Sequence, residues 1–287
     1  MSDEPRSLLF VSGARADRFP KAFAAGADVV CIDLEDAVQP SEKSMAREQT
    51  LRWLKDSAGQ RGATAAAVRL NAICTVEGLH DAAAWADGMV QLDWLMLPKV
   101  ESAADVELVA QWSGGRAAGL VALIETPRGV ENAASIAAAL SALQPRMQGA
   151  LMLGGADLAL ALNARFGWDA LFSARGRLVN AARAHGLQCW DVPYLAIDDA
   201  AGLLQETQRV IELGFSCKAA IHPTQIGPIH TAFAPDREQI RWAHALLDAL
   251  AKASTGAFIF EGKLVDAPIV SRAQRIVNLA RRQPAAR

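Results

Sequence analysis

Two acidic residues stand where metal chemistry is possible. Glu125 and Asp157 each follow a short apolar run, and a pair of glycines precedes the second. A carboxylate at the end of a buried strand is costly unless it is paired or binds a cation. Carboxylate oxygens are protein ligands that Mg²⁺ prefers, and two of them leave coordination positions for water and a substrate. We therefore predict a Mg²⁺ site at Glu125 and Asp157, which Mn²⁺ could also fill.

An arginine and a glycine-rich segment could complete the binding of a small oxo-acid. Arg69 ends another apolar run, and a guanidinium clamps a carboxylate through two hydrogen bonds. The glycines at 154 and 155 let the backbone approach a ligand, so amides around Ala156 could bind the same carboxylate. A chelated cation would act as a Lewis acid beside the bond that breaks. The predicted substrate-binding residues are Arg69, Glu125, Ala156 and Asp157.

Each of these residues also has an ordinary structural explanation. Glu125 could cap a helix or form an ion pair. Asp157 could be the N-cap of a helix that begins at Leu158. Arg69 could pair with the acidic residues between positions 33 and 36. The joint placement of two carboxylates and an arginine at strand ends favours an active site over these separate explanations.

The elements that must position these residues alternate regularly. Short runs rich in Val, Ile and Leu are separated by Ala-, Leu- and Arg-rich segments long enough for a loop and a helix. The runs predict strands at 7–12, 28–34, 66–71, 94–98, 120–125, 150–153, 188–192 and 218–221. The intervening segments predict helices at 18–25, 41–55, 77–89, 103–112, 132–143, 172–184 and 198–213. This order predicts an α/β fold, a TIM (β/α)₈ barrel, with an open doubly wound sheet as the alternative.

The last part of the chain exceeds what closure of a barrel needs. Two further helices are predicted at 237–254 and 268–282, joined by the segment 256–262. We therefore divide the chain into a barrel domain at 1–232 and a C-terminal helical extension at 233–287. The extension could fold back on its own barrel or cover the active site of a neighbouring subunit.

A barrel of this kind builds its active site at the carboxyl ends of its strands. Nearly every predicted strand ends in a polar or charged group, and the strand interiors are almost free of charge. We expect these strand-end groups to gather at one mouth. They are Ser12, Asp33, Glu35, Asp36, Arg69, Asn71, Lys99, Glu125, Asp157, Asp191 and His222.

Composition limits the other classes of function. The 287 residues are 52% hydrophobic and 21% charged, with 29 basic against 31 acidic residues. This balance gives no support for a nucleic-acid or membrane-surface role. No export signal and no apolar run of about 18 residues is found, so we expect a cytoplasmic protein. The cysteines Cys31, Cys74, Cys189 and Cys217 lack paired spacing and are expected to be buried, reduced thiols.

Several short strings carry a resemblance to a known family. They are Asp-Leu-Glu-Asp-Ala-Val at 33–38 with Lys43 and Arg47, Val-Arg-Leu-Asn at 68–71, Leu-Pro-Lys at 97–99, Ile-Glu-Thr-Pro-Arg-Gly at 124–129, Gly-Gly-Ala-Asp-Leu at 154–158 and Ile-His-Pro at 221–223. With these the chain resembles, over almost its whole length, the citrate lyase β-subunit-like branch of the HpcH/HpaI aldolase and citrate lyase family. Two positions depart from the family pattern: Ser12 replaces a usual proline, and the string at 153–157 lacks the usual phenylalanine.

The resemblance implies an enzyme and a reaction. It implies a homo-oligomeric barrel, a trimer or hexamer, that reversibly cleaves a 3-hydroxyacyl-CoA such as citryl-CoA or malyl-CoA to an oxo-acid and an acyl-CoA. It implies Mg²⁺ on Glu125 and Asp157 and Arg69 on the oxo-acid carboxylate. Two alternatives stay open: an aldolase for free hydroxy-oxo-acids without CoA, and a non-catalytic barrel that binds oxo-acids.

The resemblance also assigns supporting and catalytic residues. Glu35 and Asp36 would lie beneath the metal and accept hydrogen bonds from its waters or from Arg69. Asp266 matches the family position that enters an active site, often from a neighbouring subunit, and becomes the candidate catalytic base. Its alternative is an N-cap of the last helix. The basic residues Arg15, Arg18 and Lys21 could meet the phosphates of CoA or could simply form a solvated helix face.

Overall fold

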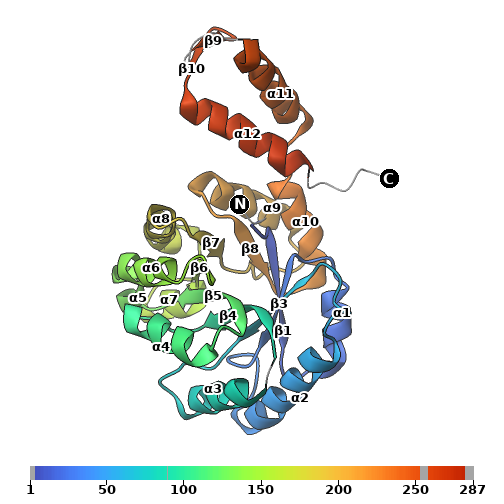
Figure 1. The fold of residues 1–287 in the computed structure, drawn as a ribbon, viewed down its shortest axis with the longest axis vertical. Helices are drawn as coiled ribbons and strands as arrows, with labels where there is room; N and C mark the ends of the chain where they lie inside the picture. Colours follow the sequence, from blue (N-terminus) through green and yellow to red (C-terminus); the bar gives the residue numbers. More distant parts are fainter. Residues whose placement is uncertain (1–3, 89, 253–257, 282–287) are drawn as a thin grey trace. The chain divides into compact units, whose positions relative to one another are not determined.

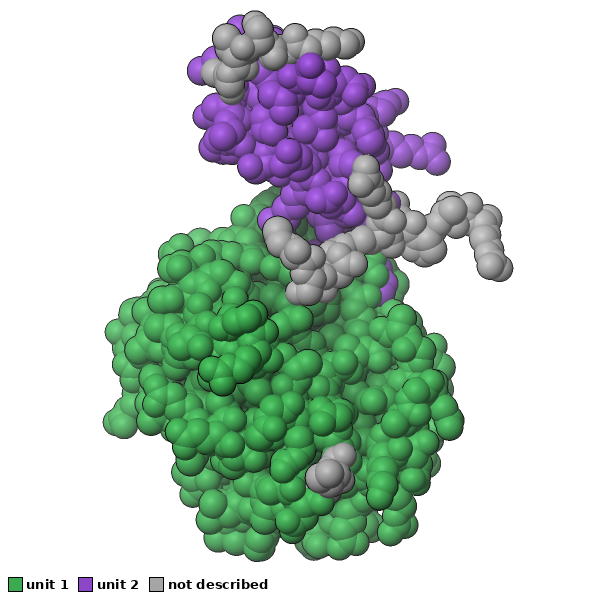
Figure 2. Space-filling model, in the orientation of Figure 1, with its two compact units in different colours: residues 1–229 green, residues 230–287 purple. Residues whose placement is uncertain are grey.

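The computed structural model describes residues 4–88, 90–252 and 258–281. Its contacts divide the chain into two compact units, Met1–Ile229 and His230–Arg287 (Figure 2). We predicted the domain boundary after residue 232. The ends of three predicted helices, at residues 89, 253–254 and 282, lie outside the described residues.

Eight parallel strands form a closed barrel in the first unit, in chain order from β1 to β8 (Figure 1). They are β1 Ser7–Ser12, β2 Val29–Asp33, β3 Ala65–Arg69, β4 Leu92–Leu97, β5 Ala117–Ile124, β6 Gln148–Leu153, β7 Gln188–Asp191 and β8 Cys217–Ala220. β8 pairs with β1, which closes the barrel. The predicted TIM barrel is confirmed, and the open sheet is wrong.

Helices follow the strands and cover the outside of the barrel. Those predicted from the sequence are α1 Phe19–Phe23, α2 Lys43–Asp56, α3 Val76–Gly88, α4 Ala103–Ser113, α6 Ala133–Ala142, α8 Trp168–Ala184 and α9 Ala200–Leu213. Local signals fix several ends: Ser102 and Asp105 form a capping box at the start of α4, and α9 ends at the left-handed Gly214. The short helices α5 Pro127–Glu131 and α10 Ile226–Phe233 were not predicted, and α7 Gly155–Ala161 begins before the helix that was considered at Leu158.

The inside of the barrel is packed with alternate residues of each strand. Cys31 of β2, Ala67 of β3 and Leu123 of β5 belong to this buried cluster, and the rings of Trp94 and Trp190 meet edge to face with centroids 4.9 Å apart. Side chains alternate between the two faces of a strand. The residue two positions after each of these core residues therefore also points inward, nearer the carboxyl end of the barrel. The first predicted site residues stand at these positions.

A balanced cluster of buried charges lies between the barrel and its helices. Trp190 points into the barrel, so Asp191 points outward, where its carboxylate accepts hydrogen bonds from Lys218 of β8 at 2.6 Å and Arg175 of α8 at 2.8 Å. Lys218 also donates to Glu206 of α9 at 2.7 Å. We call these four residues the outer cluster. The expectation that Asp191 faces the mouth is wrong, because the side-chain alternation of β7 turns it to the other face.

The second unit contains two helices and a hairpin. They are α11 Arg237–Lys252, the antiparallel strands β9 Phe258–Phe260 and β10 Lys263–Val265, and α12 Ala267–Arg281. The joining segment had been predicted without strands. Asp236 and Gln239 exchange side-chain to backbone hydrogen bonds at the start of α11.

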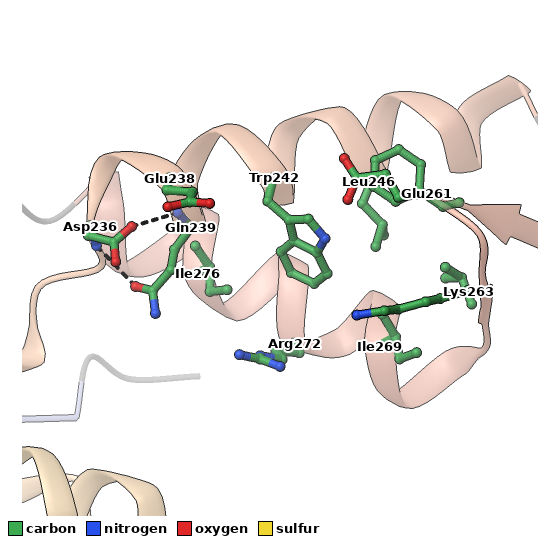
Figure 3. Close-up of a pocket in the computed structure, with 12 residues that line it drawn as sticks. Asp236, Glu238, Gln239, Trp242, Leu246, Glu261, Lys263, Ile269, Arg272 and Ile276 are labelled. Carbon is green, nitrogen blue, oxygen red and sulfur yellow. Dashed lines mark hydrogen bonds between the residues drawn. The ribbon is translucent and has the colours of Figure 1, made fainter.

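A groove of about 430 Å³ lies within the second unit (Figure 3). Arg272 lies over the ring of Trp242, with 5.6 Å from its guanidinium carbon to the ring centroid. The charged residues that line the groove have both signs.

No helix in the described ranges is long and apolar enough to cross a membrane.

Candidate active site

Three inward positions at the carboxyl ends of the strands carry charged groups. Asp33, Arg69 and Glu125 each stand two residues after an inward-facing core residue, and the strand register places Asp33 beside Arg69. They border a cavity of about 380 Å³ at the mouth of the barrel. Its lining also includes Phe10, Asp36, Met152, Gly154, Gly155, Ala156, Asp157, Phe166, Leu195 and Ile221.

Arg69 is held by three carboxylates. Its Nε and Nη2 donate to the two oxygens of Asp33 at 2.7 and 2.6 Å. Its Nη1 lies 3.0 Å from Glu35 and 3.3 Å from Asp36. Burial alone would lower the pKa of Arg69, but the hydrogen bond and charge of Asp33 outweigh burial and raise it. The ion pairs considered from the sequence are present, and they fix the guanidinium plane at the edge of the cavity.

The two predicted metal ligands both contact the same cationic group, the ammonium of Lys99. Lys99 Nζ forms an ion pair with Asp157 Oδ2 and lies 3.6 Å from Glu125 Oε1. The same Glu125 oxygen accepts a hydrogen bond from the backbone amide of Lys99 at 2.8 Å. Glu125 directly follows β5 and is buried, whereas Asp157 lies in the first turn of α7 and is partly exposed. Since one ammonium contacts both side chains, their oxygens converge on a common space.

Asp157 is not the N-cap of the following helix. The helix α7 begins at Gly155, and Gly154 takes the N-cap position. A side-chain carbon on Gly154 would lie 2.4 Å from Cβ of Glu125. Only glycine therefore allows the α7 loop to approach Glu125 this closely.

The mouth carries more negative than positive charge. Five carboxyl groups face two cationic groups, a formal excess of three negative charges when all are ionised. We call these seven residues the mouth cluster: Asp33, Glu35, Asp36, Arg69, Lys99, Glu125 and Asp157. Burial raises the pKa of Glu35 and of Glu125 to about 7, although Arg69 and Lys99 act in the opposite direction. The excess shows that the protein's own cations do not neutralise this site.

A divalent cation fits this donor set. Across the described ranges, no group of three or more His, Cys, Asp or Glu side chains is arranged to hold a metal. The candidate site therefore consists of the two carboxylates of Glu125 and Asp157, with coordination positions left for water and substrate. Oε2 of Glu35 is buried and lies 3.0 Å from Arg69 Nη1, but it accepts no hydrogen bond of good geometry within the described part of the chain. Such an oxygen suits a water bound to a neighbouring cation.

Two supporting residues escaped the sequence-based selection of site residues. Lys99 had been noted as a strand end and in the Leu-Pro-Lys string, without a role in the site, because its sequence position does not reveal that its side chain reaches both acids. Lys43 of α2 donates to the backbone oxygens of Leu34 and Glu35 at 2.8 and 2.6 Å and to the side chain of Asn71 at 2.6 Å. Lys43 thus fixes the segment that carries Glu35. The sequence signal for Lys43 was its place in the family motif, where it follows the acidic string at 33–38.

The remaining predicted residues lie in different places. Ala156 is exposed in the first turn of α7 and lines the cavity. Asp266 lies in the second unit, just before α12, where its backbone oxygen accepts a hydrogen bond from Val270. Its entry into an active site stays a prediction. His222 does not line the mouth cavity and instead caps the turn Pro223–Gln225.

Two further expectations need correction. The side chain of Asn71 is buried against Asp81 rather than turned into the cavity, because it accepts from Lys43 and donates to Asp81 at 2.7 Å. Cys74 is exposed, in contrast to the buried Cys31, Cys189 and Cys217, because it lies in the loop after β3 rather than in a strand.

The chain is similar to known proteins over almost its whole length. The chain is 33% identical to citrate lyase subunit beta of Escherichia coli K12, over 96% of this chain and 93% of that protein. It is 30% identical to human mitochondrial citramalyl-CoA lyase, over 96% and 85% of the two chains. A crystal structure of CitE from Mycobacterium tuberculosis with magnesium, acetoacetate and coenzyme A superposes with a TM-score of 0.82, at 34% identity over 97% of this chain and 98% of that chain. Residues 6–223 match the HpcH/HpaI aldolase/citrate lyase family, and the chain therefore belongs to that family.

Proposed function

We propose that this chain is a Mg²⁺-dependent carbon–carbon lyase that cleaves or forms a 3-hydroxyacyl-CoA such as citryl-CoA or malyl-CoA. The products of cleavage are an oxo-acid and an acyl-CoA. The convergence of Glu125 and Asp157 in a mouth with excess negative charge is the observation that carries this proposal. Relatives named citrate lyase subunit beta and citramalyl-CoA lyase support the reaction class.

Different residues of the mouth would bind the metal and the oxo-acid. Glu125 and Asp157 would hold Mg²⁺, which when bound supplies a Lewis acid that withdraws electron density from the oxo-acid. Arg69, already fixed by Asp33, would orient the oxo-acid carboxylate. The first turn of α7 has backbone amides without intrahelical partners, and the amide of Ala156 would bind the carboxylate from its other side. The carboxyl groups of Glu35 and Asp36 would accept hydrogen bonds around the metal and hold Arg69.

Proton transfer is assigned to Asp266. In cleavage, the carboxylate of Asp266 would take the proton of the 3-hydroxyl group as the carbon–carbon bond breaks, the electron pair of that bond would pass to the departing acyl-CoA as its enolate, and the proton would then be returned to the enolate carbon. In synthesis it would take a proton from the methyl group of an acetyl thioester. The exposed position of Asp266 before α12 supports this assignment, because a base must reach its substrate.

A second cavity offers a route for the CoA moiety. It measures about 510 Å³ and shares Phe10, Ala37 and Ile221 with the lining of the mouth cavity. Arg18 and Lys21 line it, and cationic side chains suit the phosphates of CoA. Arg15 instead pairs with Asp17 at 2.8 Å. We therefore retain Arg18 and Lys21, and not Arg15, as candidates for phosphate contact.

The assembly and location belong to the same proposal. We propose a homo-oligomer, a trimer or hexamer, in which Asp266 acts within its own chain or on a neighbour. We further propose a cytoplasmic enzyme without nucleic-acid or membrane partners, supported by the formal charge of −2. Size-exclusion chromatography with light scattering measures the assembly.

An assay of CoA thioesters tests the function. The purified chain should release an oxo-acid from citryl-CoA, malyl-CoA or a close homologue in the presence of Mg²⁺. EDTA and the double variant Glu125→Ala/Asp157→Ala should each abolish the release. Unimpaired turnover by that double variant would contradict the proposal, and turnover of free hydroxy-oxo-acids with no response to CoA thioesters would favour a CoA-independent aldolase.

A further inference from the structure

Lys99 occupies an unusual place for a lysine. Besides its contacts with Asp157 and Glu125, its ammonium lies 3.5 Å from Glu35 Oε1. Its φ angle of 53° is in the left-handed region, which non-glycine residues rarely adopt. The hydrogen bond from its backbone amide to Glu125 fixes the origin of its side chain at the site. The lysine is thus built into the centre of the mouth cluster.

The Lys99 ammonium does not complete a neutral arrangement. With Lys99 included, the mouth cluster still has five carboxyl groups against two cationic groups. A divalent cation on Glu125 and Asp157 would reduce this excess, but it would bind the same two carboxylates that the ammonium contacts at Glu125 Oε1 and Asp157 Oδ2. Two cations within a few ångströms of one another repel strongly in a partly buried site. The cation and the ammonium would therefore compete for this pair of carboxylates.

A neighbouring pocket offers the lysine a second position. Lys99 lines a cavity of about 360 Å³ together with Pro98, Glu101, Arg128 and Asn132. The carboxylate of Glu101 is partly exposed, and its contact with Arg128, at 3.8 Å, is a loose one. A lysine has a flexible four-carbon stem and a compact charge. Its ammonium could therefore turn from the mouth cluster to Glu101 without a change in the fold.

We propose that Lys99 competes with the divalent cation for Glu125 and Asp157 and thereby sets the affinity of the site for metal. When the cation binds, the ammonium moves toward Glu101; when the cation leaves, the ammonium returns and holds the two acids. The inference rests on the proposed function, since that function supplies the cation. It makes Lys99 a positioning residue that weakens metal binding, the opposite of what a purely supporting residue would do.

Binding of Mn²⁺ to the full chain tests this inference. Electron paramagnetic resonance measures free Mn²⁺ directly and needs no substrate or turnover. We expect Lys99→Met to bind Mn²⁺ about tenfold more tightly than the unmodified protein, because a competing charge near the ligands has been removed. Lys99→Arg keeps the charge and should bind within about threefold of the unmodified protein. Lys55→Met, an exposed lysine in the last turn of α2, is the matched control and should leave binding unchanged.

A second pair of variants tests the proposed movement. Glu101→Gln removes the alternative partner of Lys99, so it should weaken Mn²⁺ binding by about two- to threefold. In the Lys99→Met background the same change should have no effect, because the competing ammonium is absent. Thermal unfolding in EDTA and in Mg²⁺ checks folding: Mg²⁺ should raise the melting temperature of Lys99→Met more than that of the unmodified protein.

The outcomes separate the inference from the proposed function. Mn²⁺ binding by the unmodified protein together with equal or weaker binding by a folded Lys99→Met variant would overturn the inference alone. Failure of both proteins to bind Mn²⁺ would overturn the inference and the proposed function together.

Discussion

The two charge clusters of the barrel differ in their balance of acids and bases. The outer cluster sets two acids, Asp191 and Glu206, against two bases, Arg175 and Lys218. The mouth cluster sets five acids against two bases. The outer cluster is formally neutral without a further ion, whereas the mouth cluster keeps a negative excess that a bound cation, or protons on Glu35 and Glu125, would reduce. Charge balance therefore distinguishes the candidate active site from a structural ion-pair network.

The largest expected effect comes from unbalancing the outer cluster. Lys218→Met leaves the carboxylate of Asp191 buried with one partner fewer, and Asp191 and Lys218 are both fully buried. Breaking such a pair typically destabilises a protein by about 3–5 kcal/mol. Urea unfolding should show this loss, equal in EDTA and in Mg²⁺. The double variant Lys218→Met/Asp191→Asn should recover part of it, and a loss that depended on Mg²⁺ would break the distinction between the clusters.

The corresponding change at the mouth should have the opposite sign for stability. Glu125→Gln removes one of the excess negative charges, so in EDTA the free energy of unfolding at pH 8 should rise by on the order of 1 kcal/mol. Lyase activity should fall by about a hundredfold or more, because a metal ligand has been lost. Urea unfolding and a thioester assay on the same preparation measure both. A clear loss of stability would show that Glu125 serves the fold instead.

The two clusters should also give opposite pH dependence of stability. In EDTA, the pKa of about 7 for Glu35 and Glu125 exceeds the ordinary value of 4.5, so the folded protein binds more protons than the unfolded chain between these values. Stability should therefore fall as the pH rises through this window. Burial alone would raise the pKa of Asp191, but Lys218 and Arg175 outweigh it and lower the pKa. Its contribution is present above the unfolded pKa and is lost as the pH falls through the folded one.

Urea titrations from pH 3 to pH 8 measure both slopes. The double variant Glu35→Gln/Glu125→Gln should lose the slope between about pH 5 and pH 7 and keep the acid slope. Asp191→Asn should do the reverse. If the pH dependence of the free energy of unfolding were unchanged in either variant, the slope assigned to the substituted residues would belong to another group.

The smallest effect is expected at the rim of the mouth cluster. Asp36 pairs with Arg69, but its side chain is 59% exposed. Exposed ion pairs typically contribute less than about 1 kcal/mol. Asp36→Asn should change the free energy of unfolding by less than about 0.5 kcal/mol and activity by less than about threefold. A loss as large as that of Glu125→Gln would place Asp36 among the essential residues.

The sequence predicted the barrel because its signals are local. Each strand is a short apolar run, each run is followed by a helix-forming segment, and the polar group at the end of the run is visible in one dimension. The face of the strand to which that polar side chain points cannot be read from the sequence in the same way. Asp191 ends a strand as Arg69 does, yet it faces the helices, because the faces of a strand alternate with every residue. Lys99 could not be placed because its reach depends on a left-handed backbone and on side chains from three other segments.

The most direct measurement is the anomalous scattering of Mn²⁺ in a crystal of this protein soaked with Mn²⁺ and oxaloacetate. We expect one strong peak at the mouth, within coordination distance of the carboxylates of Glu125 and Asp157, with the oxaloacetate carboxylate against Arg69. A peak elsewhere, or oxaloacetate bound at the mouth without the ion, would contradict it.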